Sequence, residues 1–238
     1  MGKHAFSLKT IYLAALTAVF AVSFFAFVAF DLYSQQRQTE QAMLEEARTF
    51  AREMDAVWQF MDNSQSIINN SSSGGYEFKG LHCSVVGKSV GRLFSAGSDY
   101  HIRYTNFDPR SEQDIPDEFE TKALEAFNAD RSVTEYYGVA PFDGEDRFRY
   151  LQALEVDDSC LECHGEPVGE LDITDHAKEG WTLESVGGAI SIVIPLDQQQ
   201  AAMRGNVIRD MAYFLLITVF IGLVILVVTT VFVLRPLG

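Results

Sequence analysis

The sequence predicts an α+β protein, with an antiparallel sheet and a long N-terminal helix, flanked by two transmembrane helices. Two apolar blocks without a charged residue, 10–30 and 211–234 of the 238 residues, predict the membrane helices. Each block exceeds the roughly 20 residues that a helix needs to cross about 30 Å of hydrocarbon. Between them, short β-branched and aromatic runs alternate with helical periodicity, which indicates a mixed domain with an antiparallel sheet.

The charge of the chain is concentrated between the two apolar blocks. The formal net charge is −15, from 33 acidic and 18 basic side chains. Residues 1–30 contribute +2 and residues 211–238 contribute +1, so residues 31–210 have a net charge of −18. This charge would repel phosphate, which excludes nucleic acid as a partner.

The basic ends and the acidic middle also predict a topology. Short basic segments stay in the cytoplasm, so we expect residues 1–9 and the C-terminus inside and residues 31–210 outside a two-pass inner-membrane protein. We interpret the first block as an uncleaved anchor, because Phe24 and Phe27 disrupt the small-residue cleavage pattern of a signal peptide.

Residues 31–68 are predicted to continue the first membrane helix. The Asn-, Ser- and Gly-rich run 69–75 ends this helix, and the core domain follows at 76–196. Two interpretations of the helix are open: packing on its own domain, or pairing in a homodimer. Both rest on a seam of apolar residues spaced alternately four and three apart: Met43, Ala47, Phe50, Met54, Val57 and Met61.

The core domain contains four segments of strand composition, rich in β-branched and aromatic residues. A helix is predicted to begin at Pro116, because proline suits the first turn and Asp117 and Glu118 complement the helix dipole there. A polar helix from about Leu196 should lead into the second membrane block. The predicted strands are residues 100–104, 133–139, 148–150 and 189–194.

Cys160-Leu161-Glu162-Cys163-His164 is the strongest chemical motif in the chain. Two thiols three residues apart can add to the two vinyl groups of a porphyrin, and the adjacent histidine then lies beneath the iron. The alternatives are a redox pair, half of a zinc site or a structural disulfide. A redox pair does not need the histidine, and a zinc site needs a second ligand pair. The motif therefore predicts one covalent haem c, with His164 as the proximal ligand.

The residues alone leave several candidates for the ligand on the other side of the iron. Cys83 is a candidate because it is the odd cysteine once two thioethers form, although free cysteine is often a small buried hydrophobe. His82 competes with it, and His101, His176, a methionine or an open site are further alternatives. Arg103, Arg110, Arg147 and Arg149 could pair with the haem propionates or lie in solvent.

Several motifs together resemble the single-haem c-type domain family with a PAS-like fold, a former domain of unknown function. The family is found alone in cyanobacteria and as the extracytoplasmic input of bacterial sensor kinases. The resemblance covers roughly residues 40–200. Its motifs are Cys83-Ser84, the stretch 110–120, residues 148–167 around the Cys-x-x-Cys-His, Gly180-Trp181, residues 188–191 and Pro195-Leu196.

The resemblance implies a PAS-like fold and a cysteine thiolate as sixth ligand, which falls on Cys83. The chain departs from the family pattern at Ser111, Glu112 and Asp114, where the family has Asn, Pro and Asn. This departure concerns the conformation of the loop and leaves the haem motif intact.

An iron with both axial positions filled is poorly suited to turnover, so no enzymatic activity is expected. Three classes of function compete: a sensor input for redox state or a diatomic gas, a membrane-tethered electron carrier, and a haem enzyme with an open site. Residues 234–237 resemble the start of a HAMP linker, the relay to a cytoplasmic output. We therefore favour a sensor module for residues 1–238, with 235–238 a truncated linker and any kinase or other output domain outside the chain.

Overall fold

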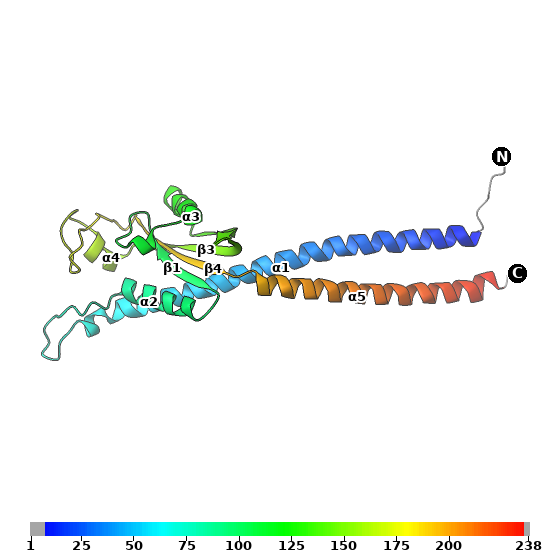
Figure 1. Ribbon diagram of the computed structural model, residues 1–238, viewed down its shortest axis with the longest axis horizontal. Coiled ribbons are helices and arrows are strands. Elements are labelled where there is room, and N and C mark those ends of the chain that lie inside the picture. The colour runs from blue at the N-terminus through cyan, green and yellow to red at the C-terminus, as the bar shows by residue number, and fades with distance from the viewer. Residues whose placement is uncertain (1–7, 236–238) are drawn as a thin grey trace. The chain divides into compact units, whose positions relative to one another are not determined.

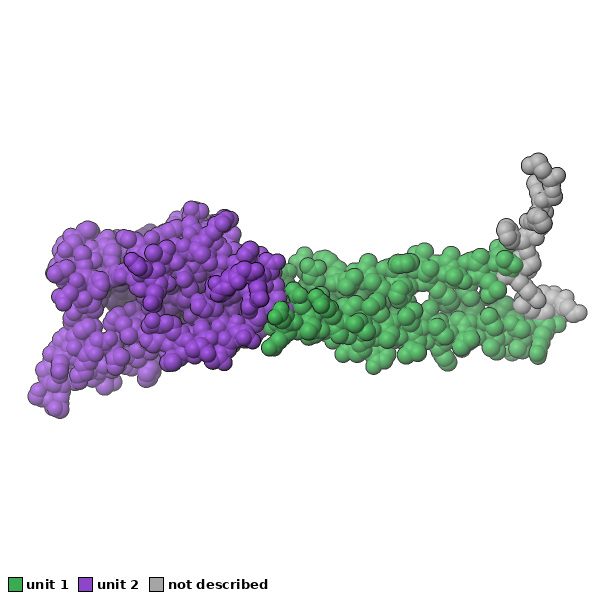
Figure 2. All heavy atoms as spheres, viewed as in Figure 1, with its two compact units in different colours: residues 1–41, 197–238 green, residues 42–196 purple. Residues whose placement is uncertain are grey.

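The computed structural model describes residues 8–235, whose elements are shown in Figure 1. In chain order they are α1 (Leu8–Ile68), α2 (Cys83–Ala96), β1 (His101–Thr105), η1 (Glu112–Asp114), α3 (Glu118–Ala129), β2 (Glu135–Phe142), β3 (Glu145–Glu155), α4 (Asp158–His164), β4 (Val186–Ile194), α5 (Asp197–Val228) and the π-helical η2 (Thr229–Leu234). Figure 2 divides the chain into two compact units, residues 42–196 and residues 1–41 with 197–238.

The sheet of unit 2, residues 42–196, has four antiparallel strands in the order β1-β4-β3-β2. Ile192 of β4 is the partner of both Ile102 of β1 and Tyr150 of β3, so β4 is an interior strand. Each strand overlaps one of the four segments predicted from composition. The α+β class, the antiparallel sheet and the long N-terminal helix are therefore confirmed.

The apolar seam of α1 is buried in the domain's own core. Met43, Ala47 and Met54 are at most 5% exposed, and they pack in one cluster with Ile190 and Ile192 of β4. Burial of apolar surface on this scale is the main stabilising contribution to such a domain. The first of the two sequence interpretations therefore holds for residues 43–54 of this seam, which pack against the chain's own sheet.

Helix α2 lies on the same side of the sheet as α1 (Figure 1) and approaches β1 through two buried glycines. A Cβ atom on Gly87 would lie 2.8 Å from the hydroxyl of Tyr104, and one on Gly91 would lie 2.9 Å from the carbonyl oxygen of Ile102. Only glycine permits this close approach. The sequence analysis did not predict α2, because glycine weakens the helical propensity of the segment.

Helix α3 covers the opposite face of the sheet (Figure 1), where Leu124 and Phe127 pack with Leu151 of β3. The helix begins with a capping box. The Asp117 carboxylate accepts from the amide of Glu120, and the Glu120 carboxylate accepts from the amide of Asp117, both at 3.0 Å. The helix start predicted from the Pro116 region is therefore explained by two reciprocal hydrogen bonds.

Beneath α3, two arginines and two carboxylates form an ion network inside the domain. Arg149 Nη2 lies 2.7 Å from Asp117 Oδ2 and 3.5 Å from Glu120 Oε1, while Arg103 Nη2 donates to Glu120 Oε2 at 2.7 Å. The Arg149 and Glu120 side chains are 2% and 1% exposed. Buried charges of this kind depend on one another, because removing one leaves its partner desolvated and unpaired.

Unit 1 contains the N-terminal part of α1 together with α5 and η2. Phe27 stacks on Phe214 with ring centroids 4.4 Å apart, and the hydroxyls of Tyr12 and Thr229 are 3.2 Å apart. Two helical segments are long and apolar enough to cross a membrane, 10–68 and 197–232. They include the whole of the first predicted span and residues 211–232 of the second. Most of the predicted cytoplasmic segment 1–9, and residues 236–238 of the predicted linker, lie outside the described residues.

Replacing Arg149 with alanine should lower the free energy of unfolding by about 3–5 kcal/mol, because Glu120 and Asp117 lose a buried cation. Arg147→Ala on the same strand is the matched control, since its partner Glu145 is 68% exposed and the loss of this pair should cost under about 1 kcal/mol. Denaturant unfolding of the full chain in detergent, followed by circular dichroism, measures both. Equal losses in the two variants would contradict the network's role.

Candidate functional site

The Cys-x-x-Cys-His motif lies on the short helix α4, directly after β3. The Asp157 carboxylate caps this helix by accepting from the amide of Cys160 at 3.1 Å. Cys160 and Cys163 are three residues apart on one helical turn, so their side chains project from the same side of it. Both are free thiols and half-buried. The sequence analysis did not predict this helix, although Asp157 is an ordinary N-cap residue.

His164 is the last residue of α4, and the loop between α4 and β4 holds its ring on one edge and one face. Nδ1 lies 2.7 Å from Glu179 Oε2, and the imidazole stacks on Trp181 with centroids 4.1 Å apart and planes 12° apart. The amide of Trp181 also donates to the carbonyl of His164 at 2.7 Å. Because a carboxylate accepts from Nδ1, the ring offers Nε2 to a metal.

The protonation state of His164 also suits a ligand. Burial lowers the pKa of His164 by more than its hydrogen bond to the Glu179 carboxylate raises it, so the imidazole is neutral near pH 7. Burial raises the pKa of Glu179, but hydrogen bonds from Arg110 and His164 outweigh this and leave the pKa below its ordinary value. The pair is therefore a neutral imidazole beside an ionised carboxylate, and neutral imidazole is the form that binds metals.

Arg110 ties the motif to the following loop. Its Nε donates to Glu179 Oε1 and its Nη1 to Asp172 Oδ2, each at 2.6 Å, and its Nη2 donates to the carbonyl of Cys163 at 2.9 Å. The Asp172 side chain is fully buried. Burial raises the pKa of Asp172, but hydrogen bonds from Thr174 and Arg110 hold it well below the usual range. Arg110 therefore joins the α4 backbone to two ionised carboxylates of the loop.

Cys83 is the first residue of α2 and reaches the same neighbourhood as α4. Burial raises the pKa of Cys83 to about 12, and negative charge on Asp62 and Cys160 contributes to this rise. The contribution of Cys160 to this rise indicates that the fold brings the two residues into one neighbourhood, although they are far apart in the chain. A buried thiol of this kind is neutral until a cation such as iron displaces its proton.

Two other candidate ligands have different surroundings. Burial lowers the pKa of His82, and the charges of Lys88, Arg110 and His164 lower it further, which indicates that His82 lies in the neighbourhood of the motif. Its Nδ1 is 2.9 Å from the Ser84 hydroxyl. His101 lies on β1 against Phe142, with centroids 5.0 Å apart. The structure therefore places Cys83 and His82 by the motif and His101 elsewhere on the sheet.

The four arginines considered for the haem propionates each pair with carboxylates of this chain. Arg103 pairs with Glu120, Arg147 with Glu145, Arg149 with Asp117, and Arg110 with Asp172 and Glu179. The side chains of all four arginines are at most 26% exposed. Their role in this structure is to hold elements of the domain together.

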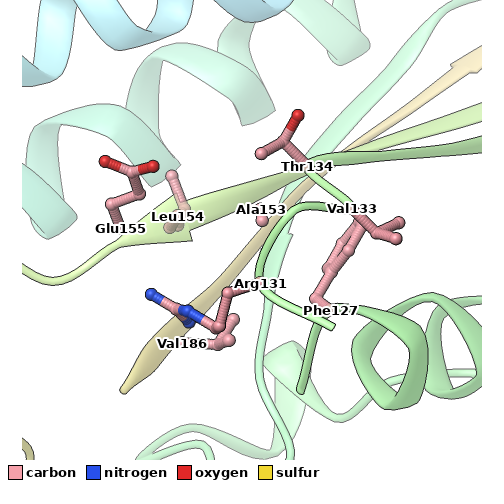
Figure 3. Close-up of a pocket in the computed structure, with 8 residues that line it drawn as sticks. All are labelled: Phe127, Arg131, Val133, Thr134, Ala153, Leu154, Glu155 and Val186. Carbon is pink, nitrogen blue, oxygen red and sulfur yellow. The ribbon is translucent and has the colours of Figure 1, made fainter. Parts of the chain in front are cut away.

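Two hollows of the domain lie away from the motif. The one shown in Figure 3 has a volume of about 10 Å³, enough for one water molecule. It is lined by residues of α3, β3, β4 and the loop between α3 and β2, such as Phe127 and Val186. A larger hollow of about 180 Å³ is lined by polar residues including Ser98, His101 and Arg147. Neither is lined by Cys83, Cys160, Cys163 or His164.

Residues 36–195 match the model of the Tll0287-like family. The chain belongs to this family. The match agrees in extent with the resemblance found in the sequence and confirms it. Among solved structures, the chain is similar to the cyanobacterial haem protein Tll0287, with 18% sequence identity, a TM-score of 0.48, and coverage of 65% of this chain and 95% of that chain. No curated protein matches.

Proposed function

We propose that this Tll0287-like chain is a membrane-bound, extracytoplasmic sensor domain that carries one covalent haem c and acts as a signalling input module. The observation that carries the proposal is the arrangement on α4, which presents two thiols on one turn and a neutral His164 fixed through Nδ1. Cys160 and Cys163 would form the thioethers and His164 would be the proximal ligand. The solved relative is itself described as a haem protein.

Cys83 is proposed as the distal ligand, in a PAS-like domain. Its thiol is buried near α4, and a ferric iron would supply the positive charge that displaces its proton. A thiolate ligand favours ferric iron, as does the acidic segment 155–179, which contains nine carboxylates and one lysine. We therefore propose a low-potential haem that remains ferric under most conditions.

Ligand exchange is the proposed switch. Ferrous iron binds thiolate more weakly, so reduction, or a diatomic gas such as CO or NO, could release Cys83 and give the domain two states. The loop that holds His164 leads into the interior strand β4, and β4 leads through Pro195 and Leu196 into α5. A shift at the iron would thus reach a membrane helix through a short covalent path.

The proposed partners are consistent with this arrangement. Two helices of sufficient length and apolarity support a two-pass inner-membrane protein with both termini in the cytoplasm and the haem outside. A homodimer, if signalling requires one, would use a surface other than the buried seam of α1. Phe60 and Ile67 of α1 are 70% and 78% exposed and are available for such a contact. The output would be a kinase or another cytoplasmic domain that receives the motion of α5.

A tethered electron carrier is the second candidate. It needs the same haem and an anchor, and the acidic surface around α4 would suit a basic redox partner. It does not need an output that responds to the state of the iron. The two proposals therefore differ in whether a change of redox state alters the activity of a cytoplasmic output.

Intact-mass spectrometry tests the cofactor. Protein exported in a host with cytochrome c maturation should show the mass of one added haem, because both thiols lie on one turn beside His164. Cys160→Ala with Cys163→Ala should abolish the addition, and Cys83→Ala, the matched cysteine control, should retain it. Wild-type apoprotein with a Cys160–Cys163 disulfide under these conditions would refute the haem.

Absorption and EPR spectra test the distal ligand. The ferric wild type should be low-spin with a thiolate signature, whereas Cys83→Ala should keep its haem yet become high-spin or water-bound, with a higher potential, because a charged donor is lost. His82→Ala is the control and should leave the spectrum unchanged. If the effects of the two variants are reversed, the distal ligand is His82.

A reporter fusion tests signalling. Residues 1–238 joined in frame to a HAMP–kinase module should give different autophosphorylation in oxidised and reduced membranes, and Cys83→Ala should remove the difference because the ligand exchange is lost. Equal kinase activity in both redox states and with CO, together with rapid electron exchange with a small basic redox protein, would favour the electron carrier.

A further inference from the structure

The partner of the His164 ring is a carboxylate that is itself clamped in place. Glu179 Oε2 lies 2.7 Å from His164 Nδ1, while Arg110 donates to Oε1 at 2.6 Å through Nε and to Oε2 at 3.0 Å through Nη2. The Glu179 side chain is 20% exposed and that of Arg110 24%. Both carboxylate oxygens of Glu179 thus accept a hydrogen bond from Arg110, and this two-pronged contact fixes the orientation of the carboxylate.

Three segments of the chain contribute to this clamp. His164 ends α4, Glu179 belongs to the loop between α4 and β4, and Arg110 precedes η1. Arg110 is held in turn by the buried Asp172 and by the carbonyl of Cys163. The Arg110 guanidinium therefore holds Glu179 in a fixed position relative to the backbone of α4, which carries His164.

A carboxylate that accepts from Nδ1 changes the strength of Nε2 as a metal ligand. An imidazole that donates its proton to an ionised carboxylate gains negative character and becomes a stronger donor at the other nitrogen. A stronger axial donor stabilises ferric over ferrous iron and so lowers the reduction potential. Trp181, stacked on the same ring, restricts its rotation and keeps Nε2 in one direction.

We propose that Glu179, clamped by Arg110, is a positioning residue that fixes His164 in its Nδ1–H tautomer and lowers the reduction potential of the iron bound at Nε2. The proposal rests on the proposed function in one respect, namely that a haem binds at His164. The tautomer itself is a property of the protein chain and can be measured without any haem.

The first measurement uses the apoprotein, expressed as the full chain without haem maturation and labelled with ¹⁵N in its histidine rings. The ring shifts of His164 should report a proton on Nδ1 and a lone pair on Nε2. Glu179→Gln should convert this to a mixture of tautomers, because a neutral amide is a weaker acceptor than a carboxylate. Glu184→Gln removes the same charge from an exposed position nearby in the chain and should leave the His164 shifts unchanged.

The second measurement is the midpoint potential of the holoprotein in detergent. Glu179→Gln should raise the ferrous-to-ferric ratio at a given potential at least about tenfold, an upward shift of about 59 mV for a one-electron couple. Glu184→Gln should shift it by much less, and Glu179→Asp should restore part of the loss. Haem stoichiometry and the Soret spectrum show whether each variant is folded and loaded.

The outcomes separate the two proposals. If the wild type gains no haem mass, the proposed function fails, and the ring shifts alone decide the tautomer. If haem is present but Glu179→Gln changes neither the His164 tautomer nor the potential beyond the Glu184→Gln control, the role of Glu179 is refuted. A change in the tautomer together with a potential shift specific to Glu179 supports it.

Discussion

Burial of the α1 seam against the sheet is the contact on which the rest of the domain depends. Ala47 and Ala51 are fully buried, in one cluster with Tyr150 of β3 and Ile190 of β4. With α1 in place, Trp58 contacts Tyr104 of β1, and α2 fits beside them only because Gly87 has no side chain. This packing brings Cys83, at the start of α2, to the neighbourhood of α4.

The charged groups of the domain form two sets with different roles. Arg149 and Glu120 lie beneath α3, where they join the sheet to the helix and serve stability. Arg110 and its carboxylates lie around α4, where the same chemistry orients a candidate ligand. Both sets depend on exclusion of water, because ion pairs in solvent contribute little. Only the second set reaches a candidate metal ligand. Its Glu179 carboxylate accepts from Nδ1 of His164, and Nε2 of the same ring can bind a metal.

The sequence indicated the elements whose signals are local. Strand composition marked all four strands, Pro116 with its acids marked the start of α3, and the Cys-x-x-Cys-His motif marked the site. Helix α2 was missed because glycines that permit packing also lower helical propensity. The partners of Arg110 were missed because a bond to Glu179, 69 residues away, has no signature in one sequence. The seam of α1 was ambiguous, since the same spacing suits a sheet and a second helix.

The central claim is that α4 and the start of α2 hold one iron between His164 and Cys83. Iron K-edge X-ray absorption of the ferric holoprotein tests it most directly, since sulfur and nitrogen scatter differently in the first coordination shell. The account predicts one sulfur and five nitrogen neighbours, with the sulfur lost in Cys83→Ala. Six nitrogen or oxygen neighbours in the wild type, with no sulfur, would contradict it.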